Sequence, residues 1–348
     1  MAPLIHTTLI ISLSLGTTMT FASTHWYLAW MGIEINTLAI IPLMTQNHSP
    51  RATEASTKYF FAQATASATL LFAAVSNAFL TGGWDILQTS HPLTSTLTTL
   101  ALAMKIGLAP LHSWMPEVMQ GLSLLTGLIL STWQKLAPLC LIYQIQPNNP
   151  NIFIILGLLS IIVGGWGGFN QVQLRKILAY SSIAHLGWMT LILPHSPPLT
   201  LLALFTYLVM TFSLFSSFML TRTTHINSLS TAGTKIPALT ASIPLVLLSL
   251  GGLPPLTGFL PKWLILQELT KQNLTPIATL AALSSLFSLY FYLRLSYTMT
   301  LTMPPNNPSG TLPWRLNPNH NTFPLALTAT ATICLLPVTP AILAFFTF

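Results

Sequence analysis

Long apolar runs follow one another along this chain and are separated by short polar or proline-rich segments. Many runs reach about 18 residues or more, which lets an α-helix cross a hydrocarbon core of roughly 30 Å. A helix satisfies its backbone hydrogen bonds internally, so a chain of this pattern is expected to be helical throughout the membrane. The pattern therefore predicts an all-α, polytopic membrane protein.

About eleven membrane-spanning segments are expected, and residues 1–348 should form a single membrane domain. The predicted ranges are 3–21, 25–45, 58–80, a fourth beginning near 93, 122–145, 152–169, 174–193, 199–220, 236–269, 274–303 and 323–346. Residues 46–57 are predicted to be a polar loop that holds Arg51 and Glu54.

Two of these segments are interrupted by one recurring pattern. Gly-Leu-x-Pro-Leu, followed after four residues by a second proline, occurs within 107–116 and again within 251–261. Glycine and proline at these points are expected to break the helices. Paired broken helices in two halves of a membrane chain are typical of a repeat-built transporter with its site at membrane depth. The approximate repeats are 1–145 and 151–303, and 323–346 is the final transmembrane helix.

Composition strengthens the membrane interpretation. Only 5% of the residues are Asp, Glu, Lys or Arg, against about 25% in ordinary soluble proteins. The formal net charge is +7, but the cations are scattered and Arg175-Lys176 is their only adjacent pair. Such scattering forms no basic patch, so a nucleic-acid partner is not expected.

Four charged residues are placed deep inside predicted spans, and they are Glu34, Lys105, Lys135 and Lys262. A charge at the bilayer centre costs about 2.5 to 3.5 kcal/mol on insertion scales. One interpretation is structural: Glu34 pairs with one lysine, and the others bond carbonyls freed at the breaks. A single such pair does not account for three lysines, so a proton relay is the sharper hypothesis.

A relay needs groups that exchange protons near neutral pH. Burial disfavours the charged form of lysine and so brings it toward that range. His112 and His185 are further candidates because histidine titrates near pH 7. Each also has a purely structural interpretation. His112 could bond carbonyls freed by the break, and His185 could be a core residue whose ring nitrogens are hydrogen-bonded. Glu117, which follows Pro116, is expected to be structural.

No motif in the sequence indicates a bound cofactor or metal. The chain has no dinucleotide fingerprint, no P-loop, no zinc-protease motif and no haem attachment site. Cys140 and Cys334 lie in separate apolar segments without metal-ligand spacing. We therefore expect this chain to bind no cofactor of its own.

Four stretches carry a resemblance to a known family: Met104 to Val118, Gln134-Lys135, Ser181 to Met189 and Gly251 to Trp263. They closely resemble the subunit 2 family among the antiporter-like membrane subunits of mitochondrial NADH:ubiquinone oxidoreductase, respiratory complex I. The likeness covers essentially the whole chain. It implies inverted repeats, and it implies that the first three helices of larger family members are missing here.

The resemblance also assigns roles to individual residues. It implies that Glu34 and Lys105 are an acid–lysine pair, that Lys135 is a connecting lysine and that Lys262 is the lysine of the second broken helix. His112 and His185 match positions on a hydrophilic axis. The implied function is proton translocation coupled to electron transfer in other subunits. The alternatives are a stand-alone cation/proton antiporter and a structural scaffold of a membrane complex.

Location, partners and cofactors follow from the same likeness. The resemblance implies that the chain is a multi-pass protein of the mitochondrial inner membrane. It also implies an obligate hetero-oligomer with other membrane and accessory subunits of complex I. Lipid is a further expected partner, with cardiolipin as the candidate. NADH, FMN, iron–sulfur clusters and ubiquinone are implied for the parent complex and not for this chain.

Overall fold

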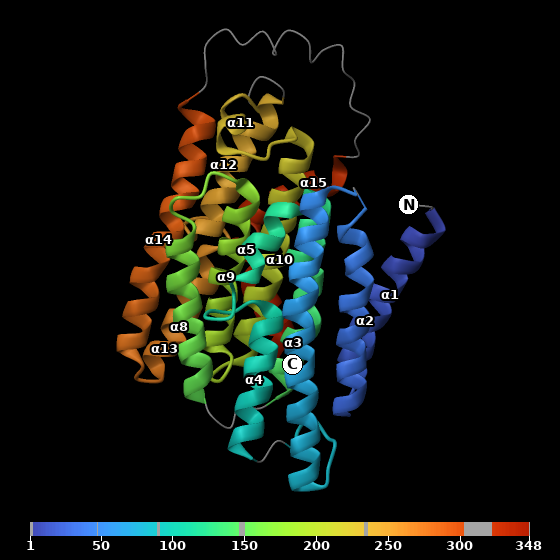
Figure 1. Ribbon diagram of the computed structural model, residues 1–348. Helices are drawn as coiled ribbons and strands as arrows, with labels where there is room; N and C mark the ends of the chain where they lie inside the picture. The colour runs from blue at the N-terminus through green and yellow to red at the C-terminus, as the bar shows by residue number, and fades with distance from the viewer. Residues whose placement is uncertain are drawn as a thin grey trace. The chain divides into compact units, whose positions relative to one another are not determined.

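The computed structural model describes residues 3–46, 48–88, 91–145, 150–232, 236–302 and 322–347, and Figure 1 shows its helices. No β-strand is found within these ranges. The helices are α1 Pro3–Ala22, α2 Trp26–Met44, α3 Pro50–Thr81, α4 Pro92–Ile106, α5 Trp114–Gly121, α6 Leu124–Ser131, α7 Trp133–Gln144, α8 Pro150–Gly167, α9 Leu174–Ile192, α10 Pro197–Thr221, α11 Ile226–Ser230, α12 Pro237–Gly251, α13 Phe259–Lys271, α14 Thr275–Thr300, α15 Phe323–Cys334 and α16 Thr339–Thr347.

Seven spans in the described ranges are long and apolar enough to cross a membrane, and the bent pair of α15 and α16 would make an eighth. One of the seven is Leu124–Gln144, which joins α6 and α7. The predicted all-α, polytopic membrane fold is confirmed. The predicted count of eleven is not confirmed, because α9 and the short helices beside the breaks fall outside this set.

The outer surface is apolar, while polar side chains lie inside. On α3, Phe61, Phe72 and Phe79 are 68%, 66% and 89% exposed, as expected for side chains that face lipid. Thr98 and Ser160 are fully buried, and each hydroxyl donates to a carbonyl one turn earlier in its own helix. Hydroxyls satisfied in this way need no partner on another helix.

Helix α3 begins earlier than the sequence predicts. The expected polar loop at 46–57 is wrong for its second half, because the helix starts at Pro50 and includes Glu54. Ser49 is the cap: its hydroxyl accepts the backbone N–H of Ala52 at 3.3 Å. Proline at the first helical position needs no donor there. Local capping thus overrides the low hydropathy of this turn.

The chain divides into two compact units, Met1–Leu156 and Gly157–Phe348. In the first unit, α3 packs against α2, α4 and α5, and α7 packs against α1, α2 and α4. In the second unit, α10 packs against α9, α12, α13 and α15, while α14 packs against α12 and α13. The repeat boundaries at 145 and 151 stay a prediction.

The first interrupted helix ends at Gly107. This residue has φ +85°, the left-handed region that glycine adopts without penalty. The amides of Gly107 and Leu108 both donate to the Ala103 carbonyl at 2.9 Å, which is a common helix ending. The chain then runs through a cis Ala109–Pro110 bond and becomes helical again at Trp114.

The second interrupted helix ends with the same backbone geometry. Gly252 has φ +82°, and the amides of Gly252 and Leu253 donate to the Leu248 carbonyl at 3.1 and 3.2 Å. The Pro254–Pro255 bond is also cis, and α13 begins at Phe259. The recurring sequence pattern therefore corresponds to a recurring local structure.

Two further irregularities differ from the predicted continuous spans. The segment 122–145 is divided at Thr132, whose hydroxyl donates to the Leu128 carbonyl at 2.7 Å. The predicted final span, 323–346, contains a bend of 71° between Phe323–Cys334 and Leu336–Phe345. Pro337 and Pro340 lie at this bend, where proline cannot donate to the preceding turn.

Candidate functional site

In the first unit, a half-buried Glu34 and a buried Lys105 lie close enough to interact electrostatically. Glu34 comes from α2 and Lys105 from the last turn of α4. Lys105 is only 5% exposed, and the two groups interact electrostatically. Among the described residues, neither Lys105 Nζ nor Glu34 Oε2 has a hydrogen-bond partner. An acid and a base are thus held near each other in the interior without being locked in direct contact.

Helix α3 supplies uncharged polar groups beside this pair. Gln63 donates from Nε2 to the Lys105 carbonyl at 3.3 Å. Tyr59 is 2% exposed, interacts electrostatically with Glu34 and stacks edge-on against Trp114 with ring centroids 5.7 Å apart. Trp114 Nε1 in turn donates to the Met104 carbonyl at 3.1 Å. These donors satisfy carbonyls that the end of α4 leaves free.

Lys135 enters the same unit from α7, three residues after the irregularity at Thr132. Its side chain is buried, with 4% exposed. The preceding residue fixes the position of this turn, since Gln134 Nε2 donates to the Asn36 carbonyl of α2 at 3.2 Å. The helix that carries Glu34 is therefore tied directly to the turn that carries Lys135.

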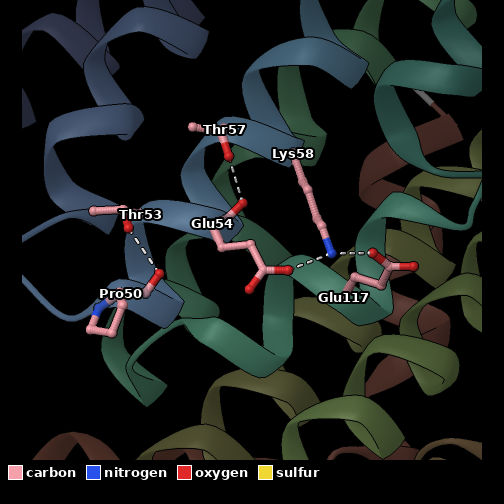
Figure 2. A network of polar contacts seen from close by, with 6 residues as sticks. All are labelled: Pro50, Thr53, Glu54, Thr57, Lys58 and Glu117. Atoms are coloured by element: carbon pink, nitrogen blue, oxygen red, sulfur yellow. Dashed lines mark hydrogen bonds and ion pairs between the residues drawn. The ribbon is translucent and has the colours of Figure 1, made fainter.

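His112 and Glu117, which follow the first break, are not brought into this buried set. The His112 ring is half-buried and its Nδ1 lies 3.3 Å from the Pro110 carbonyl, a contact within its own turn. Glu117 is exposed. Its Oε2 lies 2.8 Å from Lys58 Nζ, and the same ammonium lies 2.8 Å from Glu54 Oε1. Figure 2 shows Lys58 between the two carboxylates, so this network ties α5 to α3.

In the complex that the sequence resemblance implies, replacing Glu117 with glutamine is expected to leave turnover unchanged. The ion pair is exposed and screened by solvent, and Lys58 keeps Glu54 as its partner. The measurement is the NADH:ubiquinone turnover of that complex, with Glu34→Gln as the matched change at a half-buried carboxylate. A loss as large as that in Glu34→Gln would place Glu117 in the functional machinery.

In the second unit, Lys262 lies beyond the break, on α13, and its side chain bonds back to the end of α12. Its Nζ donates to the carbonyls of Gly251 at 2.7 Å and Leu250 at 3.3 Å. These are terminal carbonyls of α12 that have no further helical donors. The side chain also passes over Gly252, where an added Cβ would lie 2.9 Å from both Cδ and Nζ of the lysine. Glycine is thus needed here both for its positive φ and for the space that Lys262 occupies.

His185 lies beside the same lysine. Both residues line a cavity of about 20 Å³, together with Thr206, Met210 and Pro261. This volume suffices for one water molecule. His185 also packs against Tyr207, with ring centroids 5.6 Å apart, and Tyr207 is hydrogen-bonded to Ser182. The structure therefore brings together His185 and Lys262, two of the predicted residues.

No metal-binding group of three or more His, Cys, Asp or Glu side chains occurs in the described part of the chain. Cys140 and Cys334 are free thiols. The buried groups that do gather are lysines, a carboxylate, phenols, hydroxyls and an imidazole. Groups of these kinds are chemically able to exchange protons.

The sequence interpretation missed the uncharged polar residues around the charges. Tyr59 and Gln63 are four residues apart on the buried face of α3, and Ser56 and Ser67 extend that face by one turn each way. This spacing of polar side chains within a membrane span was a usable indication, because i and i+4 share a helix face. Asn36 of α2, which is 2% exposed, is another buried polar residue that the sequence interpretation missed.

Comparison with known proteins identifies the family of this chain. Residues 23–288 match the family model "NADH:quinone oxidoreductase/Mrp antiporter, TM", and residues 289–343 match "NADH dehydrogenase subunit 2 C-terminus". NADH-ubiquinone oxidoreductase chain 2 of Tetraodon nigroviridis is 66% identical over 346 residues and that of Carassius auratus 62% over 344. In both cases 99% of each chain is covered.

Solved structures show the same fold. A chain of respiratory complex I from Thermus thermophilus is 27% identical, with a TM-score of 0.82 over 96% of this chain and 79% of that chain. A chain of the Mrp complex from Dietzia sp. is 16% identical, with a TM-score of 0.76 over 97% and 74%. Because the likeness runs through nearly the whole sequence and fold, the chain belongs to the NADH-ubiquinone oxidoreductase chain 2 family of antiporter-like membrane proteins.

Proposed function

We propose that this chain translocates protons through Glu34, Lys105, Lys135 and Lys262, with His185 and His112 as exchange groups. The chain is a membrane subunit of the proton-pumping NADH:ubiquinone oxidoreductase, multi-pass in the mitochondrial inner membrane. The observation that carries the proposal is the buried Lys105 at the first helix break, which interacts electrostatically with the half-buried Glu34 of α2. Electron transfer takes place in other subunits of that complex, which hold NADH, FMN, iron–sulfur clusters and ubiquinone.

The electrostatic interaction between Glu34 and Lys105 determines how strongly the position of one charge affects the protonation of the other. A carboxylate about 10 Å from an ammonium, at an effective dielectric of about 20, contributes roughly 1.7 kcal/mol. Moving such a charge toward or away from Lys105 would change the lysine's protonation about tenfold. Transferring one proton against 100 mV costs roughly 2.3 kcal/mol. The two energies are of the same order, so bringing Glu34 close to Lys105 or taking it away would supply a large part of the free energy of one transfer step.

In the second unit the water-sized cavity offers a route between His185 and Lys262. A water there would accept a proton from one side chain and donate one to the other. The like backbone at Gly107 and Gly252 supports the view that the two breaks arose from repeats spanning 1–145 and 151–303, and the family resemblance implies that these repeats are inverted. Each break gives room for water and polar backbone beside a lysine. The protein partners are other subunits of complex I. We propose that lipid, with cardiolipin as the candidate, covers the apolar outer surface.

Replacing Lys262 with methionine tests the proposal with a control on the same helix. The change is expected to lower coupled turnover and proton pumping of the assembled complex about tenfold, since it removes the exchanging ammonium. Lys271→Met is the matched control, because Lys271 is 61% exposed and pairs with Glu268 at 3.4 Å. Equal activity of both variants and the native complex would favour a structural scaffold. Ion transport by the purified chain alone would favour a stand-alone antiporter.

A further inference from the structure

The segment between α12 and α13 is joined to the C-terminal helix by a single buried hydrogen bond. The hydroxyl of Thr257 donates to the Thr332 carbonyl of α15 at 2.7 Å. Both residues are sealed from the surroundings, with 2% of Thr257 and 1% of Thr332 exposed. Because water is excluded from a site this buried, the hydrogen bond is stronger than it would be at the surface. Its loss would leave the Thr332 carbonyl buried and unpaired.

The Thr332 carbonyl is available because of where α15 ends. The helix stops at Cys334, and the chain then bends by 71° toward α16. The last four carbonyls of a helix have no partner within it, and Thr332 provides one of them. Thr257 therefore occupies a position that a continuing helix would fill with its own backbone N–H.

The same short segment also sets the position of Lys262. Its first residues are fixed by the bonds from Gly252 and Leu253 to the Leu248 carbonyl. Its last residue, Gly258, packs so closely on the Ser249 carbonyl that a Cβ would collide with it. These contacts hold the segment to α12, whereas Thr257 holds it to α15. Since Lys262 is one turn beyond Gly258 on α13, a shift of the segment would carry its ammonium away from the Gly251 carbonyl.

We propose that Thr257 is a positioning residue that fastens the second break to the C-terminal helix and so holds Lys262 in register with the end of α12. The proposal rests on the function proposed above for Lys262. It gives α15, which belongs to the part of the chain that matches the subunit 2 C-terminus, a role in proton transfer without a lysine, histidine or carboxylate of its own.

The test compares Thr257→Val and Thr257→Ser in the assembled complex. Valine keeps the shape but removes the donor, and we expect coupled turnover to fall about threefold to tenfold. The pH profile of turnover should also change, because the position of the Lys262 ammonium relative to its carbonyls changes. Serine keeps the donor and should restore both measurements. Thr190→Val is the matched control, since that fully buried hydroxyl donates only within α9, to the Gly187 carbonyl.

Lys262→Met measured in parallel separates the two proposals. If it impairs pumping while Thr257→Val keeps native turnover and pH profile, the positioning role is overturned and the role of Lys262 stands. If Lys262→Met is itself without effect, the proposed function fails. Should the valine variant not assemble, Thr257→Cys keeps a weak donor of similar size. Its turnover should then lie below that of serine, and a cysteine variant more active than serine would contradict the proposal.

Discussion

Replacing Lys105 with methionine is expected to lower proton pumping and coupled turnover of the assembled complex by at least about tenfold. Lys105 is the buried cation that interacts with Glu34, and methionine fills similar volume without a charge. Glu34 would then be a carboxylate without its counter-charge. The measurement is the proton-to-electron stoichiometry together with NADH:ubiquinone turnover in sealed vesicles.

An exposed lysine of the same unit provides the control for this change. Lys58 is 44% exposed and lies between two carboxylates at the surface, so Lys58→Met should retain native pumping. Native stoichiometry in fully assembled Lys105→Met would exclude this lysine from proton transfer.

Replacing Gly252 with alanine is expected to reduce pumping about tenfold or more although no titratable group is changed. The new Cβ would lie 2.9 Å from Cδ and Nζ of Lys262, so the end of the lysine side chain must shift relative to the Gly251 carbonyl. The left-handed backbone adds a cost of roughly 1–2 kcal/mol. The measurements are pumping stoichiometry and the thermal stability of the complex.

Gly82→Ala isolates the backbone part of that effect. Gly82 has φ +75°, close to that of Gly252, but a Cβ there meets no described atom within 4 Å. Its alanine variant should show the same backbone penalty in stability and native pumping. If both variants pump normally, the contact between Gly252 and Lys262 has no part in proton transfer.

The membrane class and the position of the charges could be predicted from the sequence because both depend on local composition. Hydropathy finds spans of about 20 residues reliably, and a lysine such as Lys105 is conspicuous within one. The breaks were also predictable, since glycine and proline act on the backbone of their own turn. Lys105 and Lys135 are buried as their place in the spans indicates.

Contacts between uncharged polar groups far apart in the chain could not be predicted in this way. Thr257 bonds a carbonyl 75 residues away and Gln134 one 98 residues away. Threonine is abundant in this chain, and most of its hydroxyls donate within their own helix, so nothing local distinguishes Thr257 from the rest. The early start of α3 was missed because a cap and a proline outweigh hydropathy at a helix end.

The two hydrogen bonds from Lys262 to the end of α12 have a consequence for the order of events in a cycle. A helix carries about half a negative charge at its C-terminus, and a cation placed there gains roughly 0.3–1 kcal/mol, or up to about 2 when partly buried. If Lys262 transfers a proton as proposed, the neutral amine loses this attraction to the macrodipole of α12. Proton release would then weaken the contact between α12 and α13 in the same step.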